Sequence, residues 1–302
     1  MWDIIIVGGG TAGLTAAVYG ARAGRKVLLL ESSLYGGQIV TAHEIENYPA
    51  IPHISGADFA TALYEQAKAM GTTFALEPVT AVSTEGEQRV VTTPGNRYTA
   101  HTVILATGAK NRPLGLEREE ELVGRGVSYC ATCDGAFFKG KDVAVVGGGN
   151  TALDDALFLS RRSRVTLIHR RDAFRGEPQK AQQVREAENI TILYDSTVTA
   201  LHGEDALSSI TVQNLKDGSS RELAVSGLFV AIGQMPDNEA FRGVVDLDEK
   251  GYILADETCH TRTPGVFAAG DCRQKRVRQL STAAGDGTVA ALEACEFIDA
   301  LS

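Results

Sequence analysis

Two cysteines separated by two residues, Cys130 and Cys133, are the side chains of this sequence best suited to chemistry, and Asp134 follows them directly. This spacing closes a small, exchangeable disulfide and is typical of dithiol chemistry. The chain has five cysteines, which is an odd and sparse set. In a reducing compartment such a pair is more often catalytic or metal-binding than structural.

Each of these residues has a second interpretation. A zinc site at the pair would need further ligands, for which Cys259, His260 and Cys272 are available, but we expect no metal. Asp134 would move the proton that accompanies thiol exchange, or it would cap a helix that begins there. The other three cysteines are expected to be plain small hydrophobic residues rather than participants in the chemistry; they are Cys259, Cys272 and Cys295.

The cysteine pair lies between two glycine-rich motifs, GGGTAG at 8–13 and GGGNTA at 147–152. Each motif follows an apolar run, at 3–7 and 142–146, and each precedes a second run, at 26–31 and 164–169. The two copies therefore predict the same strand, glycine turn, helix and strand. Two copies at matching spacing favour two dinucleotide sites, although one copy could be only a structural unit.

The glycines of such a motif have separate physical roles. The first permits a tight turn, the second lets backbone amides approach a pyrophosphate, and the third position lets the helix pack close to its strand. The phosphates then lie at a helix N-terminus, which favours anions. The residues predicted to bind in this way are Gly8, Gly10 and Gly13 in the first copy, and Gly147, Gly149, Asn150, Thr151 and Ala152 in the second.

The ends of the second strands distinguish the two sites. The first strand ends in Glu31, a carboxylate suited to accepting hydrogen bonds from ribose hydroxyls and repelling a 2′-phosphate. The second ends in His169, Arg170 and Arg171, with Arg175 shortly after. Cations at this position suit a 2′-phosphate and therefore NADPH. The alternative is a solvated basic cluster.

The composition is that of a soluble globular protein, the length suggests about two domains, and the repeated strand–helix–strand motifs predict the α/β class. Of the 302 residues, 44% are hydrophobic and 22% charged, and the net charge is −9. This charge argues against nucleic-acid or membrane-surface partners, and no apolar run approaches the ~18 residues that span a bilayer. The N-terminus enters a strand at once, so we expect no signal peptide and a cytoplasmic protein.

Three further strands are predicted at 103–106, 228–232 and 266–269, each followed by a small-residue turn. In parallel sheets, ligands lie at the carboxyl ends of strands. The strand ends and the turns after them contribute the candidate residues Ala106, Thr107, Gly108, Ile232, Gly233 and Asp271. Candidate linkers are residues 111–114 and 234–238.

The motifs together resemble the low-molecular-weight, bacterial-type thioredoxin reductases over essentially the whole chain. The resemblance rests on the first glycine motif with Glu31, on Gly36-Gly37-Gln38, and on the segments 46–49 (ENYP) and 106–108 (ATG). It also rests on CATCD at 130–134, GGGNTA at 147–152, HRRDAFR at 169–175, PGVFAAGD at 264–271 and Arg278-Gln279.

This resemblance implies an architecture of two Rossmann-like domains, that of the pyridine nucleotide-disulfide oxidoreductases. Residues 1–112 and 243–302 would form a split FAD-binding domain, and residues 113–242 an inserted NADPH-binding domain that carries the cysteines. The family contacts to FAD would be made by Glu31, Gly36, Gly37, Gln38, Asn47, Val79, Asp271, Arg278, Gln279 and Leu280. A homodimer is also implied.

The implied activity is reduction of thioredoxin by NADPH through FAD and the Cys130–Cys133 disulfide. Cys133 would face the flavin and Cys130 would attack the disulfide of the partner. Two alternatives remain at this point. One is the same chemistry with another acceptor, such as a peroxiredoxin-like or glutaredoxin-like protein, or with a ferredoxin feed, against which the basic cluster argues. The other is a flavin-bound redox sensor or scaffold that does not turn over.

Overall fold

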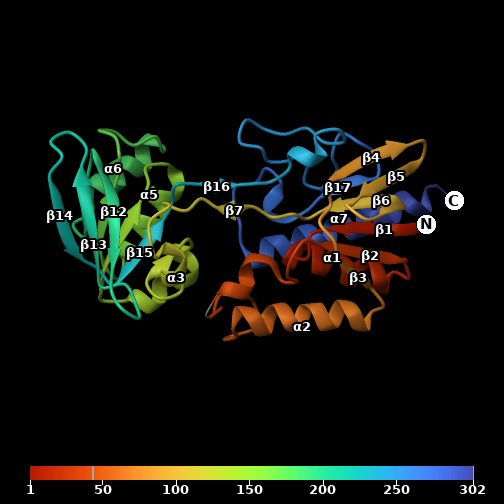
Figure 1. The fold of residues 1–302 in the computed structure, drawn as a ribbon, viewed down its shortest axis with the longest axis horizontal. Coiled ribbons are helices and arrows are strands. Elements are labelled where there is room, and N and C mark those ends of the chain that lie inside the picture. The colour runs from red at the N-terminus through yellow and green to blue at the C-terminus, as the bar shows by residue number, and fades with distance from the viewer. Residues whose placement is uncertain (43, 302) are drawn as a thin grey trace. The chain divides into compact units, whose positions relative to one another are not determined.

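The computed structural model describes residues 1–42 and 44–301, and the chain divides into two compact units (Figure 1). The first unit comprises Met1–Lys110 and Met235–Ser302, and the second comprises Asn111–Gln234. The first unit thus takes up the chain again at residue 235, earlier than the expected residue 243. The physical reason is that Phe241 is buried in the first unit's hydrophobic core.

The first unit is built on a seven-stranded sheet in the order β3-β2-β1-β6-β5-β4, with β17 also paired to β6. Its long central strand β6 pairs with antiparallel β5 along its first half and with parallel β17 along its second half. The strands are β1 (Trp2–Val7), β2 (Val27–Glu31), β3 (Thr73–Leu76), β4 (Ala81–Glu85), β5 (Gln88–Thr92), β6 (Arg97–Leu105) and β17 (Val266–Ala268).

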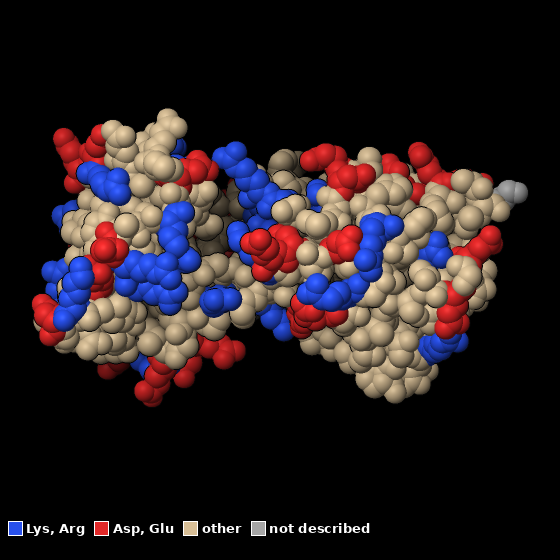
Figure 2. Space-filling model, turned by 90° about the horizontal axis from the view of Figure 1, so that it is seen from above, with Lys and Arg blue, Asp and Glu red and all other residues tan. Residues whose placement is uncertain are grey.

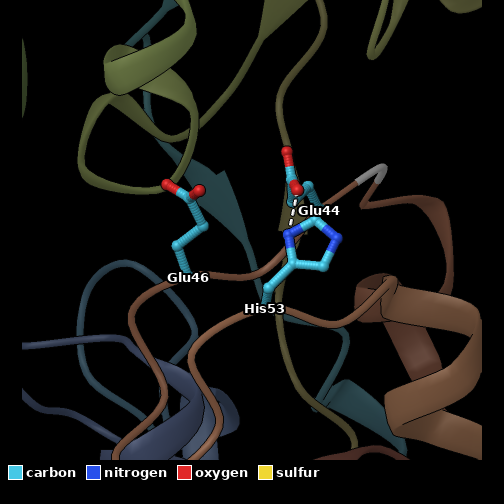
Figure 3. A group of neighbouring side chains, drawn as sticks. All are labelled: Glu44, Glu46 and His53. Carbon is cyan, nitrogen blue, oxygen red and sulfur yellow. Dashed lines mark ion pairs between the residues drawn. The ribbon is translucent and has the colours of Figure 1, made fainter.

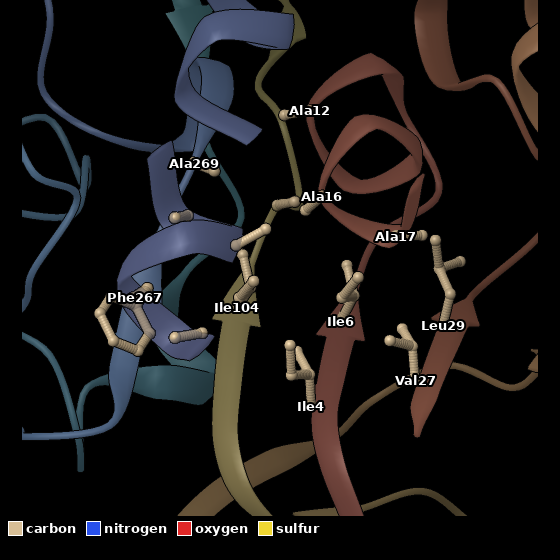
Figure 4. Packing of buried hydrophobic residues seen from close by; sticks show 14 of the residues in the cluster. Ile4, Ile6, Ala12, Ala16, Ala17, Val27, Leu29, Ile104, Phe267 and Ala269 are labelled. Carbon is tan, nitrogen blue, oxygen red and sulfur yellow. The ribbon is translucent and has the colours of Figure 1, made fainter. Parts of the chain in front are cut away.

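Three long helices belong to the first unit, together with short 3-10 segments. They are α1 (Thr11–Arg22), α2 (Gly56–Ala69) and α7 (Leu280–Asp299), with η1 (Gly37–Thr41), η3 (Glu239–Phe241) and η4 (Gly270–Cys272). Figure 4 shows the alanine-rich face of α1 lying over Ile4, Ile6 and Ile104 of the sheet. Small side chains on the helix let it approach the strands closely, so the turn between β1 and α1 is held rigidly.

The second unit repeats this plan with a five-stranded parallel sheet, in the order β11-β10-β9-β15-β8. A separate antiparallel sheet, β12-β13-β14, leads from β11 into β15. The strands are β8 (Val127–Ser128), β9 (Asp142–Val146), β10 (Arg164–Ile168), β11 (Ile190–Leu193), β12 (Ser196–His202), β13 (Ser209–Asn214), β14 (Ser220–Ala224) and β15 (Gly227–Val230). The helices are α3 (Glu119–Leu122), α4 (Ala131–Asp134), η2 (Gly135–Phe138), α5 (Asn150–Ser160) and α6 (Pro178–Glu186).

The predicted repeat is confirmed, because β1-α1-β2 and β9-α5-β10 occupy the same places in their sheets. Both units are Rossmann-like, and the predicted α/β class is also confirmed. The chain passes between the units through two short paired strands, β7 (Lys110–Asn111) and β16 (Gln234–Met235). No helix in the described part of the chain is long and apolar enough to cross a membrane.

Candidate active site

The cysteine pair is a disulfide at the start of a short helix. Cys130 and Cys133 are bonded, with their Cα atoms 5.3 Å apart. Cys130 precedes α4, and its carbonyl accepts hydrogen bonds from the backbone amides of Cys133 (3.2 Å) and Asp134 (3.1 Å). Both cysteines are partly exposed. The one-turn helix therefore fixes the spacing that the disulfide needs and leaves the sulfur atoms within reach of a reactant.

The side chain of Asp134 forms a hydrogen bond with a serine and does not cap a helix. The hydroxyl of Ser128 donates to Asp134 Oδ2 at 2.6 Å and accepts from the amide of Cys130 at 3.1 Å. Burial raises the pKa of Asp134, which the hydrogen bond from Ser128 partly offsets. Asp134 makes no side-chain capping bond, so the arrangement favours the acid–base role over the capping one. Ser128 was not predicted; its place two residues before Cys130 is the only signal in the sequence.

A buried carboxylate also fixes the chain just ahead of the pair. Glu119 is 4% exposed and accepts from the amides of Leu114, Gly115 and Leu116, and from the hydroxyl of Tyr129 at 2.8 Å. Burial and this hydrogen bond raise the pKa of Tyr129, which therefore stays a neutral donor. The residue next to Cys130 is anchored in this way. Glu119 lies in an acidic run that looks like a solvated surface, so the sequence did not predict it.

The glycines of the first motif differ in what surrounds them. A Cβ at Gly8 would lie 2.4 Å from the carbonyl oxygen of Ala106, and one at Gly13 would lie 1.9 Å from that of Gly8. These two positions must be glycine for the protein itself to pack. A Cβ at Gly10 would meet nothing within 4 Å. The protein's own packing therefore leaves open space at Gly10.

The same contrast appears in the second motif. A Cβ at Gly147 would lie 2.4 Å from the carbonyl oxygen of Ala231 and 2.6 Å from the Cβ of Ala152, whereas one at Gly149 would meet nothing within 4 Å. Gly10 and Gly149 each precede the first residue of a helix, α1 and α5. The open backbone at both positions is a cradle suited to an anion at a helix N-terminus.

Glu31 ends β2 beside the first motif. Its Oε2 accepts from the amide of Gly9 at 2.7 Å, and its Oε1 accepts from the amides of Ser32 (2.7 Å) and Ser33 (3.0 Å). These bonds hold the carboxylate at the carboxyl edge of the sheet, and Oε2 retains capacity to accept a further donor. Leu76 is paired with Glu31 in the sheet, and Val79 follows it three residues later, half-buried near the same edge.

The segments at 36–38 and 47 are brought to the first motif. Gly36 bridges to Gly10, and its amide donates to the carbonyl of Gly9 at 2.7 Å. Gln38 donates to the carbonyl of Ala109. Asn47 donates to the side chain of Gln279 at 3.3 Å, and α7 starts at the next residue, Leu280. Gly37 lies close to Gly10, where a Cβ would be 3.1 Å from the Gly10 Cα.

The turn after β6 is held by an asparagine that the sequence did not predict. Asn238 is 1% exposed; its side chain accepts from Thr107 at 3.0 Å and donates to the carbonyls of Gly251 (2.9 Å) and Cys272 (3.0 Å). It thereby ties the turn at 106–108 to the turn at 270–272. A polar residue within an expected linker carries no sign of such burial.

Asp271 and Arg278 carry buried polar atoms without partners. Asp271 Oδ1 and Arg278 Nε have no hydrogen-bond partner in the described part of the chain. Burial raises the pKa of Asp271, whereas the cations Lys275 and Arg278 lower it. The guanidinium of Arg278 lies 4.2 Å from the ring centre of Tyr252. Because buried polar groups are normally paired, these two atoms mark a place where a ligand with hydroxyl and acceptor groups would fit.

His169 departs from the expectation that it joins a cluster of cations. It is 4% exposed, and its Nε2 lies 3.0 Å from the carbonyl oxygen of Ala173. The ring fills the space beneath Gly148, where a Cβ would come within 2.2 Å of it. Burial lowers the pKa of His169, an effect strengthened by the neighbouring arginines. The imidazole therefore supports the glycine turn as a neutral ring.

The three arginines of this segment are exposed: Arg170, Arg171 and Arg175. Within the described residues none of them forms an ion pair. The amide of Arg175 donates to the carbonyl of Gly148 at 2.7 Å, so the segment folds back onto the glycine turn. Figure 2 shows basic side chains gathered on one face of this unit. These cations are therefore available to form ion pairs with a bound anion.

The side chain of Asn150 is already engaged. It donates to the Glu177 carboxylate at 3.0 Å and accepts from the Glu177 amide at 2.7 Å. Asn150 thus holds the segment after Arg175 in place. Thr151 is exposed at the next position of α5. Ile232 and Gly233 follow β15, and the Gly233 carbonyl accepts from the Arg112 amide at 3.0 Å.

The free cysteines are buried in the first unit, whereas the disulfide belongs to the second. Burial raises the pKa of Cys259 to about 12 and that of Cys272 to about 11. A separate group, Glu44, Glu46 and His53, has its ligand atoms within 4.8 Å of one another (Figure 3). An ion pair between His53 and Glu44 accounts for part of this closeness.

The description of one protein family fits both the repeated nucleotide fold and the disulfide. A family model for pyridine nucleotide-disulphide oxidoreductases matches residues 2–287. The chain belongs to the pyridine nucleotide-disulphide oxidoreductase family. It is therefore an oxidoreductase, and the disulfide between Cys130 and Cys133 is the redox group expected of the family.

Named relatives agree with this membership. The chain is 44% identical to the thioredoxin reductase of Treponema pallidum (99% of this chain, 98% of the relative) and 38% identical to that of Bacillus subtilis (100% and 96%). Among solved structures, it is similar to the thioredoxin reductase of Streptococcus pyogenes, with a TM-score of 0.95 and 38% identity over 99% of both chains. The predicted resemblance to bacterial thioredoxin reductases is confirmed.

Proposed function

We propose that this chain is an NADPH-dependent flavoprotein that reduces thioredoxin through the Cys130–Cys133 disulfide. The observation that carries the proposal is the placement of that disulfide. It opens a one-turn helix in the unit that contains the second nucleotide motif, with a half-buried acid directly after it. The names of the relatives support thioredoxin as the acceptor.

Four features of the first unit support FAD as the ligand of the first motif. The backbone at Gly10 is open, Glu31 keeps acceptor capacity at the ribose position, and Asp271 Oδ1 and Arg278 Nε are buried without partners. A flavin nucleotide would supply phosphates for the first, ribose hydroxyls for the second, and ribityl hydroxyls and flavin acceptors for the last two. When bound, it supplies a two-electron relay between NADPH and the disulfide.

NADPH fits the second motif. Gly149 leaves open space at the start of α5, and Arg170, Arg171 and Arg175 lie exposed on the segment that folds back onto Gly148. Glu31 stands at the corresponding strand end of the first motif, so the two sites differ in charge at the ribose position. This difference favours a 2′-phosphate at the second site only.

The protein's own residues then perform thiol–disulfide exchange. The Cys130–Cys133 bond accepts two electrons and breaks, and with two protons it gives the two thiol groups. Cys130, as the thiolate, attacks one sulfur of the thioredoxin disulfide; a mixed disulfide forms and a thioredoxin thiolate leaves. Cys133 then attacks Cys130, which restores the internal disulfide and releases the second thiolate. Asp134, whose pKa is raised by burial, exchanges the accompanying proton.

The test is NADPH oxidation by the FAD-loaded protein against a panel of small dithiol proteins. Sustained oxidation with thioredoxin, and little with glutaredoxin-like or peroxiredoxin-like proteins, is the expected result. Oxidation that stops after one equivalent with every acceptor would overturn the proposal and indicate a redox sensor. We also propose, from the family resemblance, a cytoplasmic homodimer; sedimentation equilibrium at micromolar concentration tests the dimer.

A further inference from the structure

A buried ion cluster, formed by Arg273, Lys275 and Asp286, fixes the turn that carries Asp271. Asp286, on α7, accepts four hydrogen bonds, and its side chain is 11% exposed. Its Oδ2 accepts from the amide of Gly270 (2.9 Å), Arg273 Nε (2.7 Å) and Lys275 Nζ (2.9 Å), and its Oδ1 accepts from the second nitrogen of Arg273 (2.8 Å). The side chains of Arg273 and Lys275 are 9% and 8% exposed. Both ends of the turn at 270–275 are thus fixed to one carboxylate.

The segments that carry the cluster pack against the first glycine motif. Gly270 has a φ of +80°, and a Cβ there would lie 2.8 Å from the Cβ of Ala12. On α7, a Cβ at Gly287 would lie 2.2 Å from the carbonyl oxygen of Ala12. The turn and the helix that hold the cluster therefore both pack on the first turn of α1. A shift of Asp286 would move the backbone that carries Asp271.

The charges of the cluster do not cancel. Arg273 and Lys275 share the single carboxylate of Asp286, which leaves one positive charge in excess. Although burial opposes it, hydrogen bonds from both cations lower the pKa of Asp286, so it is ionised at neutral pH. Lys275 and Arg278, from the same loop, lower the pKa of Asp271, whereas Asp286 from α7 raises it. Cys272 and Tyr252 are further titratable groups that interact with Asp271.

We propose that Asp286, with Arg273 and Lys275, is the positioning group of the flavin site, which places Asp271 to accept a hydroxyl hydrogen from FAD. This inference rests on the proposed function. Burial and the negative charge of Asp286 favour the protonated form of Asp271, whereas the cations Lys275 and Arg278 favour the ionised form. A protonated Asp271 would lose acceptor capacity in a carboxyl group whose buried Oδ1 has no partner within the described residues.

The experiment is titration of the apoprotein with FAD, followed by quenching of flavin fluorescence between pH 5 and 9. Asp286→Asn leaves two buried cations without a counterion, and we expect the dissociation constant to rise about tenfold or more. Asp286→Glu keeps the charge and is expected to recover part of the loss. The matched control is Asp246→Asn, which breaks the exposed Arg262–Asp246 pair of the same unit and is expected to leave FAD binding unchanged.

Lys275→Met provides a second test because it leaves the two-bond Arg273–Asp286 pair intact, so the fold should survive. Without Lys275 the pKa of Asp271 rises. FAD affinity, which is lost as the pH falls through that pKa, is then lost at a higher pH than in the parent protein. A role in stability alone would not move this pH profile. Circular dichroism of each apoprotein confirms that the variant compared is folded.

The outcomes separate the two proposals. If the parent protein takes up no FAD, the proposed function is overturned and this inference falls with it. If the parent binds FAD, and folded Lys275→Met matches it at every pH, only the positioning role is overturned. A shifted profile in Lys275→Met, with weaker binding in folded Asp286→Asn, supports it; if Asp286→Asn does not fold, the Lys275→Met profile decides.

Discussion

At the scale of single residues, we expect the exposed arginines to decide which nicotinamide cofactor is used. Each charge-assisted hydrogen bond to a phosphate contributes roughly 1.5–3 kcal/mol. Replacing Arg170 and Arg171 together by Ala is therefore expected to weaken NADPH binding about a hundredfold or more and to leave NADH nearly unaffected. Binding isotherms for both cofactors provide the measurement, with Arg161→Ala, another exposed arginine of this unit, as the control. Equal use of NADH by the parent protein would contradict the prediction.

The two cysteines are expected to differ in role. Cys130→Ser leaves Cys133 as a thiolate beside the oxidised flavin, which is expected to produce a long-wavelength charge-transfer absorption band. Cys133→Ser leaves Cys130 able to trap thioredoxin as a stable mixed disulfide but unable to complete turnover. Visible spectra and non-reducing electrophoresis check these outcomes. A charge-transfer band in the Cys133 variant would reverse the assignment.

Asp134 is expected to lower the stability of the folded protein at neutral pH while supporting its activity. Its pKa is raised in the folded protein by burial, so the folded state binds the proton more tightly than the unfolded state does. Its contribution to stability therefore falls as the pH rises from the unfolded pKa, about 4, to the higher folded pKa. Asp134→Asn does not titrate and is expected to lower turnover about a hundredfold or more.

The measurement for Asp134→Asn is thermal unfolding from pH 4 to 8. The variant is expected to gain stability over the parent as the pH rises across this window. Asp172→Asn, at an exposed position in the same unit, is the control. A difference in melting temperature that stayed constant with pH, or that shrank as the pH rose, would count against the burial argument.

At the scale of elements, the glycine turns separate packing from binding. Gly13→Ala puts a Cβ 1.9 Å from the carbonyl oxygen of Gly8 and is expected to destabilise the apoprotein by about 2 kcal/mol or more. Gly10→Ala enters open space, so the apoprotein is expected to keep its stability while FAD binding weakens. Chemical denaturation and FAD titration of both variants provide the check. If Gly10→Ala bound FAD normally, the cradle at Gly10 would have no role.

The elements predicted from the sequence are those whose signals are local. The repeated strand, turn, helix and strand were predicted because an apolar run and a glycine turn reveal them without knowledge of distant contacts. The antiparallel strands β4, β5 and β12–β14 were not predicted, because their pairing depends on partners along the sheet. Long-range pairing also hides the cluster of Arg273, Lys275 and Asp286, which reads in the sequence as ordinary surface charge.

His169 shows the same limit at the site itself. Its place in the sequence matches that of Glu31 in the first copy, which predicted a role at the ribose. The ring instead fills space that Gly148 leaves, and this depends on the return of residues 173–176 to the turn. Alignment of the copies located the strand end, but the direction of the side chain could not be predicted from it.

At the scale of the whole molecule, turnover is expected to require rotation of the second unit against the first. The disulfide and the proposed NADPH site belong to the same unit, yet both must reach one flavin, and the disulfide must also meet a protein. The paired strands β7 and β16, through which the chain passes between the units, are the expected hinge. A crosslink that locks the units with the cysteines at the flavin is expected to permit dithiol–flavin exchange and to abolish thioredoxin reduction by NADPH. Normal turnover in the locked enzyme would sink the idea.

The two ends of the second unit lie next to each other. Where the chain enters and leaves, the Gln234 side chain donates to that of Asn111 at 3.0 Å, and the Arg112 amide donates to the Gly233 carbonyl at 3.0 Å. Chain ends this close cost little loop entropy to join, so the first unit could be closed across the gap by a few residues. Residues 111–234 therefore form a unit that could be inserted or removed as a whole. The gene segment that encodes these residues could be inserted into, or removed from, a reading frame without breaking the strand pairing of the main sheet in either unit.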